Sequence, residues 1–246
     1  MKYIRVFLIT QLFLFLLLNT RITALAMNTG FSTEALSVDE QNSFLSHFGI
    51  SMLMAEPQKK PVECFDVSEE GLIAVGCSDS MMSTKKMICI YADDGTFLYG
   101  YQFEDYGVFG VEWDQDRLII YLVRSARAVV VNPAGEIEDV SEIQNTIENH
   151  AYWRKSVFSK ERLVGDTKYT LKNDMGILNF FASAYSQVVV EKSSGERAVI
   201  YDAGIYHLVS MLVVVVIVIL MICIVVIGIT REVIKQRRAF KAKSVV

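Results

Sequence analysis

The chain has few of the residues that build metal centres and disulfide frameworks. Among its 246 residues are three histidines, four cysteines and three prolines. The histidines are far apart, and none has the spacing of a zinc motif: His47, His150 and His207. Three cysteines, an odd number, lie before the last apolar stretch, which leaves no complete disulfide framework. We therefore expect no metal ion and no cofactor, and we expect Cys64, Cys77 and Cys89 to be small apolar strand residues.

Catalytic motifs are also missing. The sequence contains no G-x-S-x-G, no phosphate-binding loop and no G-x-G-x-x-G. Carboxylates are plentiful between Asp66 and Asp116, but most stand where turns are expected, and aspartate favours turns by bonding its own backbone. We assign no catalytic residue. The alternative is a hydrolase or glycan-acting enzyme, which would need two of these carboxylates at a fixed separation in a cleft.

Positive charge is scarce in the middle of the chain. The formal net charge is −4. Three basic residues lie in positions 1–26 and six in positions 231–246, where Glu232 is the only acid. Positions 27–207 therefore hold 15 of the 24 basic residues and 27 of the 28 acidic ones, for a net charge of −12. This balance excludes nucleic acid as a partner, because phosphate binding needs a positive surface.

The N-terminal residues 1–26 have the pattern of a secretory signal peptide. Lys2 and Arg5 precede an apolar run of thirteen residues, Val6 to Leu18, which is too short to cross a bilayer comfortably. Ala24-Leu25-Ala26 then fits the small-x-small cleavage pattern. The sequence predicts a cleaved signal peptide, with an uncleaved N-terminal anchor as the alternative.

The segment from Leu208 to Thr230 is the longest uncharged stretch. A helix of this length rises roughly 35 Å, which is enough to cross a bilayer with some tilt. A lone segment in hydrocarbon must satisfy its own backbone hydrogen bonds, so it has to be helical. We predict a single transmembrane helix over 208–230.

The residues after this helix set the expected orientation. Positions 231–246 form a short tail with six basic side chains: Arg231, Lys235, Arg237, Arg238, Lys241 and Lys243. The positive-inside rule places this tail in the cytoplasm and the N-terminal domain outside. We expect the basic residues to anchor the tail on anionic headgroups of the lipid bilayer. The chain is thus predicted to be a single-pass protein of the cell membrane.

Residues 27–61 read as a linker with one short helix. Ser37-Val38-Asp39-Glu40 matches a capping box, and Phe44, Leu45 and Phe48 fall on one helical face. We expect a helix from about Val38 to Phe48, ended by Gly49. The small polar residues of 30–37 indicate linker.

Residues 62–207 have the pattern of an antiparallel β domain. Short apolar runs alternate with polar turns that contain glycine or aspartate, which is typical of hairpins. The expected strand pairs are 65–67 with 72–75, 87–91 with 96–103, 111–113 with 118–123, 128–131 with 136–137, 162–164 with 169–171, and 188–190 with 198–201. Two short helices are candidates, one within 143–152 and one within 173–185.

One sequence pattern recurs three times in this domain. Apolar triplets at 88–90, 129–131 and 188–190 each lead through a short polar turn to Gly95, Gly135 and Gly195. Spacing near 40 residues with about four strands per unit is typical of propeller blades. The repeated segments, which lie within Val62 to Asp202, resemble the blades of NHL, WD-type and related β-propellers. The resemblance implies blade-like four-stranded units in an incomplete propeller, because three units are fewer than the usual four. A β-meander or sandwich packed by the short helices is the alternative.

The aromatic side chains are dense around the second hairpin. Tyr99, Tyr101 and Phe103 share one face of a strand. Such a face normally packs in a core or against a neighbouring strand. The other hypothesis is an exposed, partner-facing aromatic surface.

Together these patterns favour a binding function. We expect a membrane-anchored extracytoplasmic interaction module, a subunit of an envelope complex, with a protein partner or a homo-oligomer covering its free sheet edges. The alternatives are the carboxylate enzyme described above and a ligand sensor that signals through a partner, because sixteen tail residues cannot form an output domain.

Overall fold

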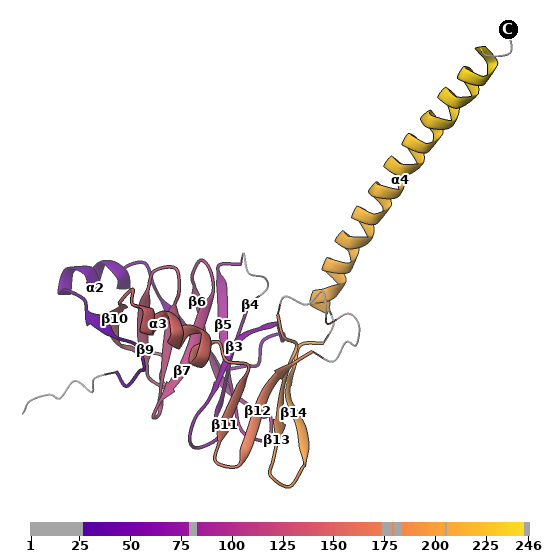
Figure 1. Cartoon of the computed structure of the whole chain (residues 1–246). Helices are drawn as coiled ribbons and strands as arrows, with labels where there is room; N and C mark the ends of the chain where they lie inside the picture. The colour runs from indigo at the N-terminus through magenta and orange to yellow at the C-terminus, as the bar shows by residue number, and fades with distance from the viewer. Residues whose placement is uncertain (1–26, 79–82, 174–178, 180–183, 205, 244–246) are drawn as a thin grey trace, which may run out of the picture.

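The computed structural model describes residues 27–78, 83–173, 179, 184–204 and 206–243; the signal-peptide prediction lies outside them, and the candidate helix within 173–185 lies mostly outside them. These residues form three antiparallel sheets (Figure 1). In spatial order, sheet A contains β1 (Thr33–Ala35), β10 (Ile137–Ile143), β9 (Arg127–Val131), β8 (Arg117–Leu122) and β7 (Phe109–Asp114). Sheet B contains β2 (Ile50–Leu53), β6 (Phe97–Glu104), β5 (Lys85–Tyr91), β4 (Ile73–Ser78) and β3 (Val62–Val67). Sheet C contains β11 (Glu161–Val164), β12 (Thr167–Lys172), β13 (Gln187–Glu191) and β14 (Arg197–Asp202).

Each sheet is built on four strands that are consecutive in the sequence. The recurring sequence pattern forms the same turn in each sheet. Gly95, Gly135 and Gly195 have φ between +82° and +86°, a conformation that suits glycine because it has no Cβ. Their N–H groups close the turns on the carbonyls of Ala92, Asn132 and Lys192 at 2.9–3.0 Å. The predicted mainly β domain and its hairpins are therefore confirmed.

Sheet B lies between sheets A and C (Figure 1). Alternate residues of its central strands enter different cores. Ile88 and Ile90 of β5 pack with sheet A, whereas Cys89 and Tyr91 pack with sheet C. Burial on both faces explains the uninterrupted apolar run from Met87 to Tyr91 in β5. Sheet C is buried on one face only, and β12 accordingly alternates between buried and partly exposed residues.

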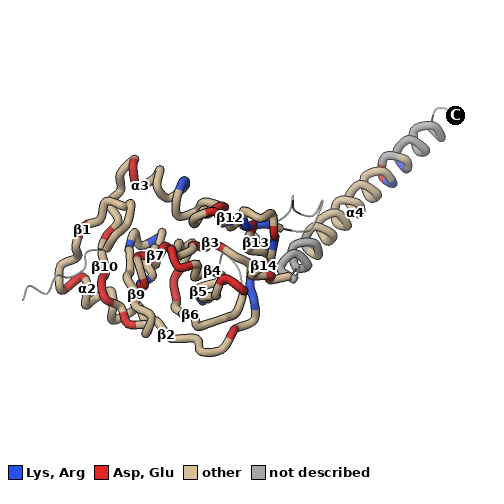
Figure 2. Tube along the Cα trace, turned by 90° about the horizontal axis from the view of Figure 1, so that it is seen from below, with Lys and Arg blue, Asp and Glu red and all other residues tan. Residues whose placement is uncertain are grey.

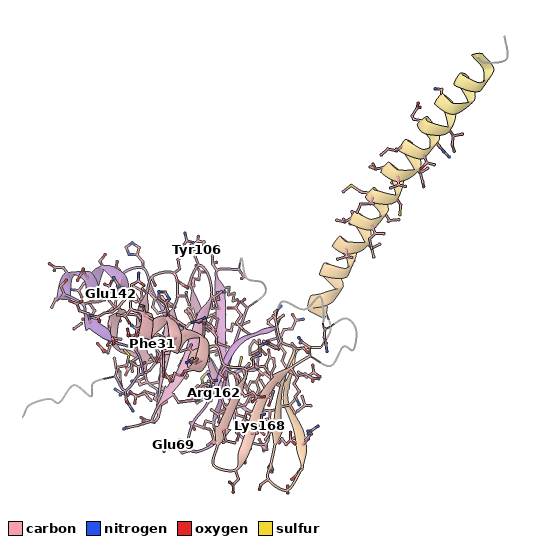
Figure 3. The ribbon with its side chains drawn as sticks, viewed as in Figure 1. Phe31, Glu69, Tyr106, Glu142, Arg162 and Lys168 are labelled. Atoms are coloured by element: carbon pink, nitrogen blue, oxygen red, sulfur yellow. The ribbon has the colours of Figure 1, made fainter. Side chains whose placement is uncertain are left out.

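The outer face of sheet A is covered by Phe31, from the N-terminal segment, and by two helical elements that follow β10. The helix α3 (Ile147–Tyr152) continues into the π-helical turn η1 (Trp153–Val157). Phe31 packs among the rings of Tyr121, Tyr152 and Trp153, with centroids 4.6–4.8 Å apart. A third core therefore lies between this cover and sheet A (Figure 3).

The N-terminal segment differs from the expected linker. Residues Thr33–Ala35 form β1, which pairs with β10, and Ile50–Leu53 form β2, which pairs with β6. Between them, α2 (Val38–Leu45) has the predicted capping box at Ser37 and Glu40, although it ends three residues earlier than expected. Strands of three or four residues carry too little periodicity to be recognised from sequence.

The chain ends in one long helix, α4 (Tyr206–Lys243), which leaves the domain beside the end of β14 (Figure 1). It contains an apolar window, Val215–Glu232, none of which is buried against the rest of the protein. An exposed apolar helix of this kind is consistent with a single membrane anchor.

Candidate functional site: the sheet junction and the open side of sheet C

One buried carboxylate joins all three sheets. Asp66 on β3 accepts a hydrogen bond from Arg162 Nε on β11, 2.6 Å from its Oδ1. Its other oxygen, Oδ2, accepts the backbone N–H of Trp113 on β7 at 2.8 Å. The single carboxylate of Asp66 thus links sheet B to sheet C through one hydrogen bond and to sheet A through another. Arg162 lies at this junction (Figure 3).

The guanidinium of Arg162 has several further partners. Its Nη2 donates to the carbonyl of Val157 in η1, and its Nη1 donates to the carbonyls of Ser159 and Glu161, all at 3.1 Å. The group also lies 5.2 Å from the ring centroid of Phe65. A guanidinium with this many fixed donors positions the sheets rather than a ligand.

A second carboxylate lies in the same region, on β7. Glu112 accepts hydrogen bonds from the hydroxyls of Tyr121 and Tyr152. Burial raises the pKa of Glu112, the charge of Asp66 raises that pKa further, and the two tyrosine hydroxyls oppose the rise. Burial also raises the pKa of Asp66, and the Arg162 charge opposes that shift.

A raised pKa suits a carboxyl group that acts as a general acid, whereas its partner carboxylate must stay ionised to act as base or nucleophile. Here, however, both oxygens of each carboxylate accept hydrogen bonds from protein groups. Two cavities are found elsewhere. One, of about 400 Å³, is lined by Lys160, Leu171, Lys172, Asn173, Asn179, Ala184 and Tyr185. The other, of about 260 Å³, is lined by His47, Gly49, Ser51, Gln102, Phe103 and Glu104.

A buried ion pair ties β5 to the edge strand β3 across β4 in sheet B. Lys86 on β5 is fully buried, and its Nζ lies 3.2 Å and 3.4 Å from the two carboxylate oxygens of Glu63 on β3. The hydroxyl of Ser78 on β4 also donates to Glu63. The ammonium group lies 5.7 Å from the ring centroid of Phe109 in sheet A. The pair is enclosed by protein, so we assign it a structural role.

The aromatic residues proposed to face a partner belong to the core. Tyr101 and Phe103 are only 1% and 2% exposed, and Tyr99 is partly buried beside them. They lie between sheets A and B, next to β2, because β6 is an interior strand once β2 has paired with it. The partner-facing assignment of Tyr101 and Phe103 is therefore wrong, and the core hypothesis holds for them.

Histidines and cysteines show no arrangement for chemistry. Over the described ranges, no group of three or more His, Cys, Asp or Glu side chains is placed to hold a metal ion. Cys64, Cys77 and Cys89 are free and buried in strands, as predicted. The basic residues of the tail follow the apolar window on the same helix, α4.

Sheet C differs from the other two sheets in having an open side. Its inner face packs on sheet B, but its outer face exposes Leu163 by 73% and Val199 by 53%. Val189 also faces outward, opposite Val199. The other outward residues are polar or charged, and two ion pairs, Lys168 with Glu161 and Arg197 with Glu191, lie on this face. Its outer strand, β14, has a strand neighbour on one side only. This exposed side lies next to the start of α4 (Figure 1).

The fold and its helix define a class: a mainly β protein with three antiparallel sheets and one exposed apolar C-terminal helix. Comparison with protein-family models, curated proteins and solved structures gives no match to this chain.

Proposed function

We propose that this chain is a membrane-anchored, extracytoplasmic binding subunit of an envelope complex. The observation that carries the proposal is the unequal covering of its sheets. Sheets A and B have fifth strands, and sheet A is also covered by α3, η1 and Phe31. Sheet C, which lies next to the anchor, has an open edge and an open face. Such an edge normally has to be blunted or paired.

The distribution of charge supports this assignment. Acidic and basic residues both lie on the domain (Figure 2). Positions 27–207 hold 27 acidic and 15 basic residues, whereas positions 231–246 hold six basic residues and one acid. The positive-inside rule then puts the tail in the cytoplasm and the sheets outside. In this arrangement the three sheets are blade-like units of an incomplete propeller, and a partner protein covers the end of the arc at sheet C.

A second candidate function is favoured by one observation. Asp66 and Glu112 lie in one region, and burial raises the pKa of both; a raised pKa is what the general acid of a hydrolase or glycan-acting enzyme with paired carboxylates requires. If this enzyme function is right, E112Q abolishes an activity that the wild-type protein shows on envelope glycans. If binding is the function, E112Q retains the native cross-linked complex described next. A ligand sensor that signals through a partner would also need this complex.

The binding proposal is tested by cross-linking the tagged full-length protein in its own cells, followed by mass spectrometry. We expect a discrete second protein in the cross-linked species. Leu163→Lys places a charge on the open face of sheet C and should weaken that species. Ile147→Lys is the matched control, because Ile147 is 83% exposed on α3, on the far side of sheet A. Equal loss in both variants, or no cross-linked partner, would contradict the proposal.

A further inference from the structure

The outer edges of sheets A and B are completed in the same way. β1 pairs antiparallel with residues 141–143 of β10, and β2 pairs antiparallel with residues 100–103 of β6. Both strands occupy nearly the same stretch of the outer strand: β1 pairs six to eight residues after Gly135, and β2 pairs five to eight residues after Gly95. The equivalent stretch after Gly195 is residues 200–203, that is, the last three residues of β14 and Ala203, which follows it. Among the residues that the structure describes, no strand pairs there.

The backbone of this stretch faces outward at Asp202. The N–H of Ala203 donates to the carbonyl of Ser186 at 2.8 Å, so residue 203 points into sheet C. Because backbone groups alternate along an antiparallel strand, the N–H and C=O of Asp202 point to the open edge. Gln102 of β6 and Glu142 of β10 stand at the same distance from their glycines, opposite Ser51 of β2 and Glu34 of β1.

The β5–β6 turn approaches the first residue of this stretch, where a Cβ on Gly95 would lie 3.3 Å from the carbonyl oxygen of Ile200. Beyond Ile200, little blunts the edge. Residues 198–201 of β14 carry no charge and no proline, which are the usual protections of an edge strand. A bulge at Ile200 interrupts the register of β14 at the start of this stretch, whereas the bulges of β6 and β10 lie at Leu98 and Glu138, before the residues that accept β2 and β1. Residues 201–203 lie beyond the bulge of β14. Asp202 is exposed, and its side chain bonds Gln187 and the N–H of Gly204 rather than capping the edge.

We propose that the edge of β14 at residues 200–203 binds an extended segment of a different membrane protein, which adds to sheet C as its fifth strand. This inference rests on the proposed binding function and names its partner class and site. Strand addition supplies main-chain hydrogen bonds, and side chains at alternate positions supply specificity. The chain already uses this mode twice within itself, through β1 and β2.

The position of the anchor fixes the direction of the partner. β14 ends at Asp202 and α4 begins at Tyr206, so four residue steps of at most about 14 Å separate them. β14 therefore runs towards the membrane. Every strand pair in the described ranges is antiparallel, so the added segment runs away from the membrane. This direction fits a segment that directly follows a transmembrane helix of the partner, on the same side of the bilayer.

The same geometry disfavours a second copy of this chain. In an antiparallel pair of two β14 strands, the two α4 helices would leave from opposite ends. Six residues of strand span roughly 20 Å, so two anchors in one bilayer would be displaced along the paired strands by about this distance. A different protein meets no such conflict.

The internal strand β2 indicates the chemistry of the added segment. Ile50 and Met52 of β2 stand opposite Phe103 and Tyr101 and pack against the core, whereas Ser51 between them is exposed. Tyr201 occupies in β14 the place that Tyr101 occupies in β6. We therefore expect a segment of three to four residues, with apolar side chains beside Tyr201 and Ala203 and a polar one opposite Asp202.

The test places a photo-cross-linking amino acid at Val199 of the full-length protein in its native membranes. Val199 lies on the same edge and is 53% exposed, and the same amino acid at Ile147 on α3 is the control. We expect an adduct at 199 whose linked peptide lies just after a transmembrane helix of another protein. No such adduct is expected at 147.

A pair of variants at Asp202 separates backbone pairing from side-chain contact. Asp202→Ala and Asp202→Pro both lose the carboxylate, but only proline removes the edge-facing N–H. With the photo-cross-linker at 199, we expect the proline variant to give about tenfold less adduct than the alanine variant, because a main-chain bond is lost and its acceptor is left unpaired. Thermal unfolding of both variants checks that sheet C is intact.

The outcomes separate the two proposals. Adducts between two copies at 199, or equal adduct yields in the alanine and proline variants, overturn strand addition by a different protein. A partner that cross-links only at other positions also overturns it, but leaves the binding function standing. The absence of any partner overturns both. If the proline variant unfolds, the test of strand addition is the identity of the peptide that cross-links to position 199 in the protein with the native Asp202.

Discussion

Arg162 Nε lies 2.6 Å from Asp66 Oδ1, and this contact ties β11 to β3 although 96 residues separate the two in sequence. Both side chains are largely buried, with 16% and 11% of their surface exposed. The pair therefore holds sheet C against sheet B at the point where sheet A also meets them through Trp113.

Arg162→Ala should destabilise the protein by about 3 kcal/mol, because it leaves the Asp66 carboxylate buried without its charge partner. The measurement is urea unfolding of the full-length protein in detergent, followed by the fluorescence of Trp113 and Trp153, the two tryptophans of the chain. Arg197→Ala removes an exposed pair with Glu191 and should cost less than about 1 kcal/mol. If both variants lost a similar amount of unfolding free energy, the contact between Arg162 and Asp66 would stabilise the protein no more than an exposed ion pair does.

Glu63→Gln should also be costly, by about 3 kcal/mol, because it leaves the ammonium of Lys86 fully buried without a counter-charge. The double variant Lys86→Met with Glu63→Gln should recover most of this loss, since no buried charge remains. Glu161→Gln, which breaks an exposed pair with Lys168, serves as the control. A double variant less stable than Glu63→Gln alone would contradict the prediction.

The pH dependence of stability should report on Glu112. Burial raises its folded-state pKa above the value in the unfolded chain, so the folded protein binds this proton more tightly. The contribution of Glu112 to the free energy of unfolding therefore falls as the pH rises from the unfolded pKa through the folded pKa. The difference in unfolding free energy, wild type minus Glu112→Gln, should thus decrease as the pH rises above about 4.5.

This difference isolates Glu112, because Asp66, whose pKa is also raised by burial, is present in both proteins. Glu69→Gln in the exposed turn between β3 and β4 gives the matched control, for which a flat difference is expected. A flat difference for Glu112→Gln as well would mean that its carboxylate has the same pKa in both states.

Much of the fold could be predicted from sequence, because the informative signals are local. The turn glycines at 95, 135 and 195, the uncharged helix and the capping box at Ser37 each depend on a few neighbouring residues. The contact between Asp66 and Arg162 could not be predicted, since it depends on how separate sheets pack. For Tyr101 and Phe103 the sequence left two hypotheses open, core and partner-facing, because the choice depends on sheet A covering this face of β6.

The orientation of the chain in the membrane gives a direct prediction. Tyr106 is 65% exposed on the domain, and Ser244 follows the basic residues of the tail. With a membrane-impermeant maleimide, Tyr106→Cys should be labelled in intact cells and Ser244→Cys only after permeabilisation, because the basic tail favours the cytoplasm. The wild-type chain is the control. Three of its cysteines are buried in strands, and Cys223 lies within the apolar window of α4, so it should label in neither condition. The reverse labelling pattern would place the sheets in the cytoplasm and exclude an extracytoplasmic partner at β14.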